Sequence, residues 1–315
     1  MMSHNETTPL SRRTLVTAVS AGAAASLIGR GSVSTARADG HEGGEAYSMT
    51  RGYADGPFGQ VHYQDVSPSN PKGLPLILLH QAPMTLRQFD SILAPLAERG
   101  VRSISIDTPG FGQSAPPDFV PTVEDYATAI PAVLDHLGLE QVDLLGHHTG
   151  AMIATSVALQ FPDRINNLII NGPFPMTDEE RAGFLARNKT GERDFVHEHD
   201  GTHVQNSFLG RYRMYGEGVD PKLITRYTAE KFIGLGPFWY GHHAAFQYNH
   251  NVDLPKIKHR TLLLTNTGDQ IYENAKWAKK MRPDLDYVAI EGGGVDIVDQ
   301  MPEEWSDVVV GFLHG

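Results

Sequence analysis

The stretch that decides the fold reads Val142-Asp143-Leu144-Leu145-Gly146-His147-His148-Thr149-Gly150-Ala151-Met152-Ile153-Ala154. Its apolar start predicts a short buried strand, and its run of small and apolar residues predicts a helix. Between the two, glycines four residues apart indicate a sharp turn, because a side chain at Gly146 or Gly150 would collide with the adjoining strand or helix. The pattern therefore places the imidazole of His148 at the tip of a strand–turn–helix unit.

This unit resembles the nucleophile elbow of the α/β-hydrolase fold family, which usually has Ser, Asp or Cys at the middle position. Further segments over residues 50–315 are similar to the family in the same order. They are the His80-Gln81-Ala82-Pro83-Met84 loop, the Asp107-Thr108-Pro109-Gly110-Phe111-Gly112-Gln113-Ser114 motif, and Asp269 at the position of the family's acid. The resemblance implies an α/β fold with a doubly wound, mostly parallel sheet and an inserted helical lid.

The local patterns agree with that fold. Alternating or continuous apolar runs predict strands, and amphipathic stretches with capping residues predict helices. The expected strands are 59–66, 74–79, 101–107, 165–171, 260–265 and 287–291, and the expected helices outside the lid include 122–137, with Thr122 as N-cap, and 302–313.

The pattern changes over residues 174–251, where charged helical stretches alternate with Gly-rich breaks. The family inserts its lid at this place, and a lid supplies the pocket roof and much of the substrate selectivity. Aromatic residues gather near the end of this segment, around Tyr240, His242 and His243. These three side chains are candidates for a catalytic acid or for substrate contacts, although packing is the alternative for each.

Two of the three positions of the family's Ser–His–acid triad are altered, because His148 stands at the nucleophile and Val295 stands where the family has its histidine. The usual acyl transfer has neither its hydroxyl nor its imidazole here. We hypothesise that the imidazole has moved: the ring of His148 leans into the volume that Val295 leaves empty and bonds Asp269. His147 is expected to line the pocket wall or to orient the turn.

The resemblance also implies an oxyanion hole formed by the backbone N–H groups of Ala82 and Thr149. Gln81 replaces the usual glycine of that loop, so its side-chain amide is expected to add a donor to the site.

An Asp–His pair without a hydroxyl has two possible roles. His148 acts as general base on water or on the substrate, which we favour, or it attacks a carbonyl and forms an acyl-imidazole. Hydrolysis of an ester, a lactone or a C–C bond, and lyase or isomerase chemistry, all remain open for a small carbonyl substrate. The alternatives are a non-catalytic ligand-binding protein, and a serine esterase that uses Ser114 or a lid histidine.

Composition narrows the partners. The formal net charge of -11 argues against nucleic acid and anionic membranes. The chain has no cysteine, and its 15 histidines show no H-E-x-x-H or H-x-x-E-H spacing, so no metal site is expected. The expected partner is a small-molecule substrate, without a cofactor, and nothing in the sequence indicates an oligomeric state.

The first 38 residues are typical of an export signal. Ser11-Arg12-Arg13-Thr14-Leu15-Val16 resembles a twin-arginine motif, a modest apolar run follows, and Ala36-Arg37-Ala38 offers a cleavage site. Residues 1–38 are therefore expected to be a signal peptide, 39–48 a linker and 49–315 the folded domain. A periplasmic or secreted protein is the corresponding expectation.

Overall fold

The computed structural model describes residues 47–215 and 218–315. The predicted signal peptide and most of the predicted linker thus lie outside the described residues. The last two residues of the predicted linker belong to the sheet, because β1 (Tyr47–Gly56) pairs along its whole length with β2 (Gly59–Pro68).

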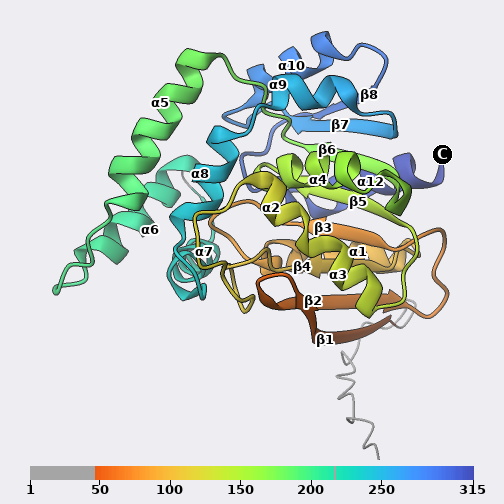
Figure 1. The fold of residues 1–315 in the computed structure, drawn as a ribbon, viewed down its shortest axis with the longest axis horizontal. Helices are drawn as coiled ribbons and strands as arrows, with labels where there is room; N and C mark the ends of the chain where they lie inside the picture. The colour runs from red at the N-terminus through yellow and green to blue at the C-terminus, as the bar shows by residue number, and fades with distance from the viewer. Residues whose placement is uncertain (1–46, 216–217) are drawn as a thin grey trace, which may run out of the picture. The chain divides into compact units, whose positions relative to one another are not determined.

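Within the described residues, eight strands form one sheet in the order β1-β2-β4-β3-β5-β6-β7-β8 (Figure 1). β2 pairs antiparallel with β1 and β4, and all other neighbours are parallel, which confirms the predicted mostly parallel sheet. The remaining strands are β3 (Leu76–Leu79), β4 (Ser103–Ile106), β5 (Val142–His147), β6 (Ile165–Asn171), β7 (Arg260–Asn266) and β8 (Asp286–Ile290).

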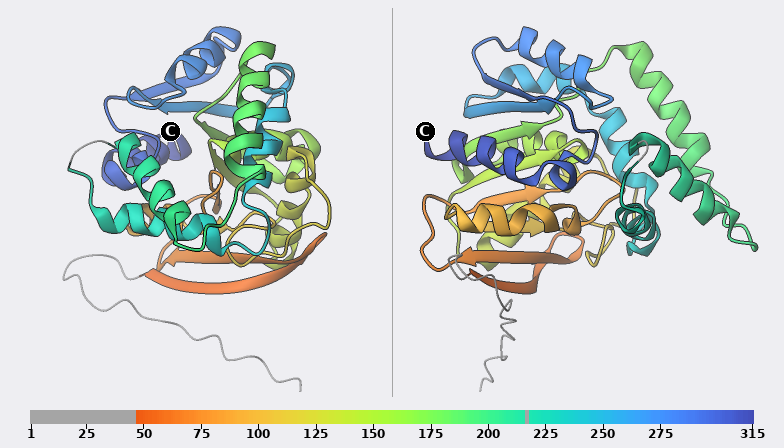
Figure 2. Two further views of the ribbon diagram at one scale, coloured as in Figure 1. Left: turned by 90° about the vertical axis from the view of Figure 1, so that its left-hand side faces the viewer. Right: turned by 180° about the vertical axis from the view of Figure 1, so that it is seen from behind.

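Helices cover both faces of this sheet. α1 and α12 lie on one face and come to the front when the molecule is seen from behind (Figure 2). In β3, Leu76 and Leu78 pack in the hydrophobic cluster of that face, while Ile77 and Leu79 pack in the cluster of the other face. A strand buried on both sides must be apolar throughout. The helices outside the insertion are α1 (Asp90–Glu98), α2 (Val123–Ala127), α3 (Ala129–His136), α4 (Thr149–Gln160), α9 (His250–Asp253), α10 (Tyr272–Met281), α11 (Ile297–Gln300) and α12 (Pro302–His314).

The helix predicted over 122–137 is two helices, α2 and α3, with a break at Thr128. Thr122 is the N-cap, as predicted, and forms a capping box with Asp125. Pro131 explains the break, because proline has no N–H to donate to the carbonyl of Ala127 and its ring collides with that carbonyl.

The turn between β5 and α4 shows why its glycines are needed. A Cβ at Gly146 would lie 1.9 Å from the carbonyl oxygen of Gly150, and a Cβ at Gly150 would lie 2.1 Å from that of Leu79. His148 itself has φ 50° and ψ −110°, and no other non-glycine residue of the described chain has a positive φ. Side chains rarely tolerate this conformation, so the fold holds the imidazole in a strained turn.

A group of helices, here called the insertion helices, lies between β6 and β7 at one end of the sheet (Figures 1 and 2). They occupy most of the segment predicted as a lid. Their bounds are α5 (Asp178–Asn188), the π-helical turn η3 (Lys189–Arg193), α6 (Thr202–Tyr215), α7 (Pro221–Ile233) and α8 (Trp239–Gln247).

Buried carboxylates attach the insertion helices to the sheet domain. Asp296, in the loop after β8, is bonded by Arg211 and Tyr215 of α6, and it also accepts a 2.6 Å hydrogen bond from Gln81. Burial alone would lower the pKa of Arg211, but the neighbouring carboxylate of Asp296 raises it. Asp296 therefore supplies the counter-charge of the buried Arg211 guanidinium.

Asp299 and Glu230 make two further attachments. Asp299 of α11 accepts a 2.7 Å hydrogen bond from Arg226 of α7. Glu230 of α7 accepts hydrogen bonds from the N–H and the hydroxyl of Thr85, at 3.3 and 3.0 Å. Burial raises the pKa of Glu230 to about 7, although Arg226 and Thr85 act in the opposite direction. This carboxyl group consequently takes up a proton more readily in the folded protein than in the unfolded chain.

Glu230 is expected to make the free energy of unfolding depend on pH. Because its pKa is raised on folding, stability falls as the pH rises from the ordinary glutamate value to about 7. Glu230→Gln removes the titrating group and is expected to abolish about 1–3 kcal/mol of that fall. Urea unfolding of both proteins at about pH 5 and about pH 8 measures the difference. An equal fall in the two proteins would contradict the prediction.

Candidate active site

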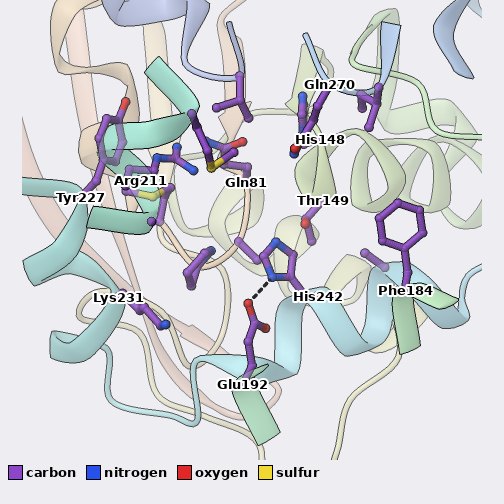
Figure 3. Close-up of a pocket in the computed structure, with 18 of the residues that line it drawn as sticks. Gln81, His148, Thr149, Phe184, Glu192, Arg211, Tyr227, Lys231, His242 and Gln270 are labelled. Carbon is purple, nitrogen blue, oxygen red and sulfur yellow. Dashed lines mark hydrogen bonds and ion pairs between the residues drawn. The ribbon is translucent and has the colours of Figure 1, made fainter. Parts of the chain in front are cut away.

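A cavity of about 350 Å³ lies where the insertion helices meet loops that follow the sheet strands (Figure 3). The loops after β3, β5, β6, β7 and β8 each contribute to its lining, and these are the carboxyl ends of parallel strands. Ligands of open α/β sheets bind at this edge. The position and the presence of an open cavity make it the candidate active site.

His148 and Asp269 are in contact at the floor of this cavity. His148 Nε2 lies 2.7 Å from Asp269 Oδ2, and the carboxylate is fully buried. Burial would raise the pKa of Asp269, but the imidazole and the N–H of Ile271 outweigh burial and lower it. An ionised carboxylate only accepts hydrogen bonds, so Nε2 carries the proton and Nδ1 is the basic nitrogen.

The chain leaves room for this ring. A Cβ at Gly172 would lie 2.5 Å from His148 Cδ2, so a larger residue there would displace the imidazole. Val295 lines the cavity together with His148, and its correspondence to the family's histidine position stays a prediction. Among the described residues Nδ1 of His148 has no hydrogen-bond partner.

The two expected oxyanion donors also line the cavity. Neither the N–H of Ala82 nor that of Thr149 donates to another described residue. Thr149 is the first residue of α4, so its N–H has no partner within the helix. His80 fixes the loop of Ala82, since its Nδ1 bonds the carbonyl of Gln81 at 2.9 Å and its Nε2 accepts the N–H of Thr108 at 3.0 Å.

Gln81 lines the cavity, and its side-chain amide donates one hydrogen bond to Asp296 at 2.6 Å. Gln81 therefore joins the oxyanion loop to the attachment of the insertion helices. The amide has two N–H groups, so its expected role as a donor to substrate stays a prediction.

Of the two roles expected for His147, lining the pocket wall as a substrate contact is wrong, whereas orienting the turn stays a prediction. Its side chain is fully buried and absent from the cavity lining, with Gln88 bonded to its Nδ1. Burial and the neighbouring His148 hold the pKa of His147 well below its usual value, so this imidazole is neutral. His147 lies behind the ring of His148, with the ring centroids 4.7 Å apart in an edge-to-face contact.

Of the three aromatic candidates on α8, only His242 lines the cavity. Tyr240 and His243 lie elsewhere and make edge-to-face contacts with Trp239, with ring centroids 4.7 and 5.2 Å from its ring. His242, Ala245 and Phe246 share the cavity face, as the i, i+3 and i+4 positions of a helix do. The substrate-contact predictions for Tyr240 and His243 are corrected accordingly.

Ser114 is unavailable as a nucleophile. It is fully buried outside the cavity lining, where it donates to the carbonyl of Asp107 at 2.6 Å and accepts the N–H of His62 at 2.9 Å. The alternative of a serine esterase therefore cannot use the hydroxyl of Ser114 as its nucleophile.

Sequence reasoning missed three charged residues of the cavity, namely Glu192, Arg211 and Lys231. Arg211 and Lys231 lie across the cavity from Phe184 (Figure 3). Burial lowers the pKa of Lys231, while Glu192 opposes that change. The one available signal was the charged character of the insertion, which is equally typical of a solvent-exposed helix.

Two further observations concern only the described part of the chain. No group of three or more His, Cys, Asp or Glu side chains is placed to hold a metal ion. No helix there combines the length and the apolarity needed to cross a membrane.

A doubly wound sheet, a glycine-flanked turn and a cavity at the strand ends define an α/β enzyme domain. A family model described as the alpha/beta hydrolase fold matches residues 75–294. The chain belongs to the alpha/beta hydrolase fold family, and the match confirms the resemblance on which the expected fold rests.

Relatives and solved structures agree with this family. A haloalkane dehalogenase of Mycolicibacterium paratuberculosis is 30% identical over 39% of this chain, but the match covers only 40% of the dehalogenase. A non-heme haloperoxidase of Rhodococcus erythropolis is 27% identical over 70% of this chain and 82% of its own length. The enol-lactonase structure from Burkholderia xenovorans LB400 superposes with a TM-score of 0.69 and 16% identity, covering 84% of this chain and all of that one. The sequence similarities agree with the alpha/beta hydrolase fold family, and the structural superposition shows its fold.

Proposed function

We propose that the protein hydrolyses a small carbonyl compound, an ester or lactone, with His148 as general base. The observation that carries this proposal is the 2.7 Å bond between His148 Nε2 and Asp269, beside an open cavity. The sequence left two classes open, an enzyme and a protein that only binds ligands, and this geometry favours the enzyme. A cavity filled by apolar side chains would have favoured binding alone.

The proposed reaction uses the basic nitrogen of His148. Nδ1 removes a proton from a water molecule, whose oxygen attacks the substrate carbonyl. The N–H groups of Ala82 and Thr149 stabilise the oxyanion that forms, because both lack other partners among the described residues. Asp269 fixes the tautomer of the ring and stabilises the imidazolium. No cofactor takes part in this proposed sequence.

Asp269→Asn tests the dyad. The asparagine amide can donate to Nε2, which would move the ring proton to Nδ1 and leave no basic nitrogen facing the cavity. We expect kcat/KM for p-nitrophenyl esters and aryl lactones to fall by about 10²-fold or more. Thermal unfolding of the variant controls for loss of structure. Wild-type rates in a folded variant would contradict the proposal.

The same substrates separate a base from a nucleophile. A nucleophilic His148 would form an acyl-imidazole, so mass spectrometry of the intact protein during turnover would show a transient acyl adduct. General-base catalysis predicts an unmodified mass. An adduct located on His148 would replace the base mechanism with covalent catalysis.

The predicted location remains a proposal. We propose export by the twin-arginine route, supported by the Arg12-Arg13 pair and the Ala36-Arg37-Ala38 sequence, which precede the described domain. Fractionation of cells that express the full chain tests it.

A further inference from the structure

The cavity contains a second imidazole–carboxylate pair, supplied by the insertion helices. His242 Nδ1 on α8 lies 2.8 Å from Glu192 Oε1 on η3, and both residues line the cavity (Figure 3). Their side chains are 28% and 19% exposed, so the pair is partly desolvated but open to the cavity. Both residues of the pair line the same cavity as His148.

The ring of His242 is held in one orientation. It stacks on Phe246, with ring centroids 5.4 Å apart and planes inclined by 11°. Nδ1 is taken by Glu192, and Nε2 has no hydrogen-bond partner among the described residues. In Figure 3 the second ring nitrogen points away from Glu192 and toward the centre of the group of labelled side chains. It can therefore meet a bound molecule.

The charges around the pair favour an ionised carboxylate on Glu192. Burial would raise the pKa of Glu192, but His242, Lys231 and Asn188 lower it, so Glu192 is ionised. An ionised partner stabilises an imidazolium. The other charged or titratable side chains of the cavity lining are Arg211 of α6, Tyr227 and Lys231 of α7, and His148 of the turn.

We propose that His242, held by Glu192, is the general acid that protonates the leaving group. This inference rests on the proposed function. His148 takes one proton from water while the water oxygen bonds the carbonyl carbon. As the tetrahedral intermediate collapses, the bond to the leaving oxygen breaks and that oxygen takes the proton of His242. His148 then releases a proton to solvent and His242 regains one, so both rings return to their starting states.

Leaving groups of different basicity test the role of His242. An alkoxide leaves poorly without a proton, whereas p-nitrophenolate leaves readily, so only the alkyl ester needs the acid. For His242→Gln we expect kcat/KM to fall by about 10²-fold or more with an ethyl ester, and by less than about tenfold with the p-nitrophenyl ester of the same acid. Glu192→Gln, which keeps the size of the side chain, is also expected to lower the rate with the ethyl ester more than the rate with the p-nitrophenyl ester. The comparison uses the full chain.

Two controls make the outcome decisive. His199→Gln removes an exposed histidine of the same insertion and is expected to leave both rates unchanged. His148→Ala is expected to lose activity toward both esters. Retained activity in this variant would overturn the proposed function. Equal losses for the two esters in His242→Gln, or no loss, would overturn the general acid alone. A wild-type protein that hydrolyses neither ester would overturn both proposals.

Discussion

His148→Ala is expected to lower kcat/KM for ester hydrolysis by at least about 10³-fold. The substitution removes the imidazole that bonds Asp269 through one nitrogen and opens to the cavity through the other. It also leaves the buried Asp269 carboxylate without its main partner. Residual activity would come from the oxyanion donors and from substrate binding. Initial rates with purified wild type and variant measure the effect.

A matched control comes from a second histidine–aspartate pair in the same chain. His62 Nδ1 lies 2.8 Å from Asp107 Oδ2, outside the cavity. His62→Gln is expected to keep the wild-type rate, because it removes a similar interaction between two residues that do not line the cavity. Loss of activity in both variants to the same extent would indicate damage to the fold and would count against the base role of His148.

Asp296→Ala is expected to lower the free energy of unfolding by about 3–5 kcal/mol, since removing one partner of a buried ion pair strands the other charge. Asp296 has no exposed side-chain surface, and it bonds Arg211, Tyr215 and Gln81. The substitution leaves the guanidinium of Arg211 buried without a counter-charge. Urea unfolding at about pH 7 measures the loss.

The control for this prediction is a surface ion pair. Asp135 pairs with Arg164 and its side chain is 68% exposed, so Asp135→Ala is expected to change stability little. If Asp296→Ala cost no more than Asp135→Ala, the attachment of the insertion helices to the sheet domain would not depend on this carboxylate.

The elements that sequence could predict are those specified by nearby residues. The glycines of the turn, the apolar run of β3 and the cap at Thr122 each act within a few residues, and the structure has them as expected. The break at Thr128 was missed, although Pro131 signals it locally. The contact between His148 and Asp269 could be predicted from the family pattern, because that pattern fixes which strand ends lie side by side.

The rest of the site depends on contacts between distant parts of the chain. Glu192 and His242 are 50 residues apart, and Arg211 and Asp296 are 85 apart, so no local pattern connects them. The second difficulty was to predict which side of a helix faces the cavity. Adjacent residues such as His242 and His243 point to different sides of α8, and sequence alone did not show which side faces the cavity.

The pairing of His148 with Val295 in one cavity has an evolutionary consequence. Reaching an ordinary serine triad from this chain takes two substitutions, His148→Ser and Val295→His. The first alone leaves a hydroxyl with no imidazole to activate it. The second alone gives Asp269 two rings competing for one carboxylate. We therefore expect neither single substitution to create a serine-type site, so that a change to the ordinary triad would require both together.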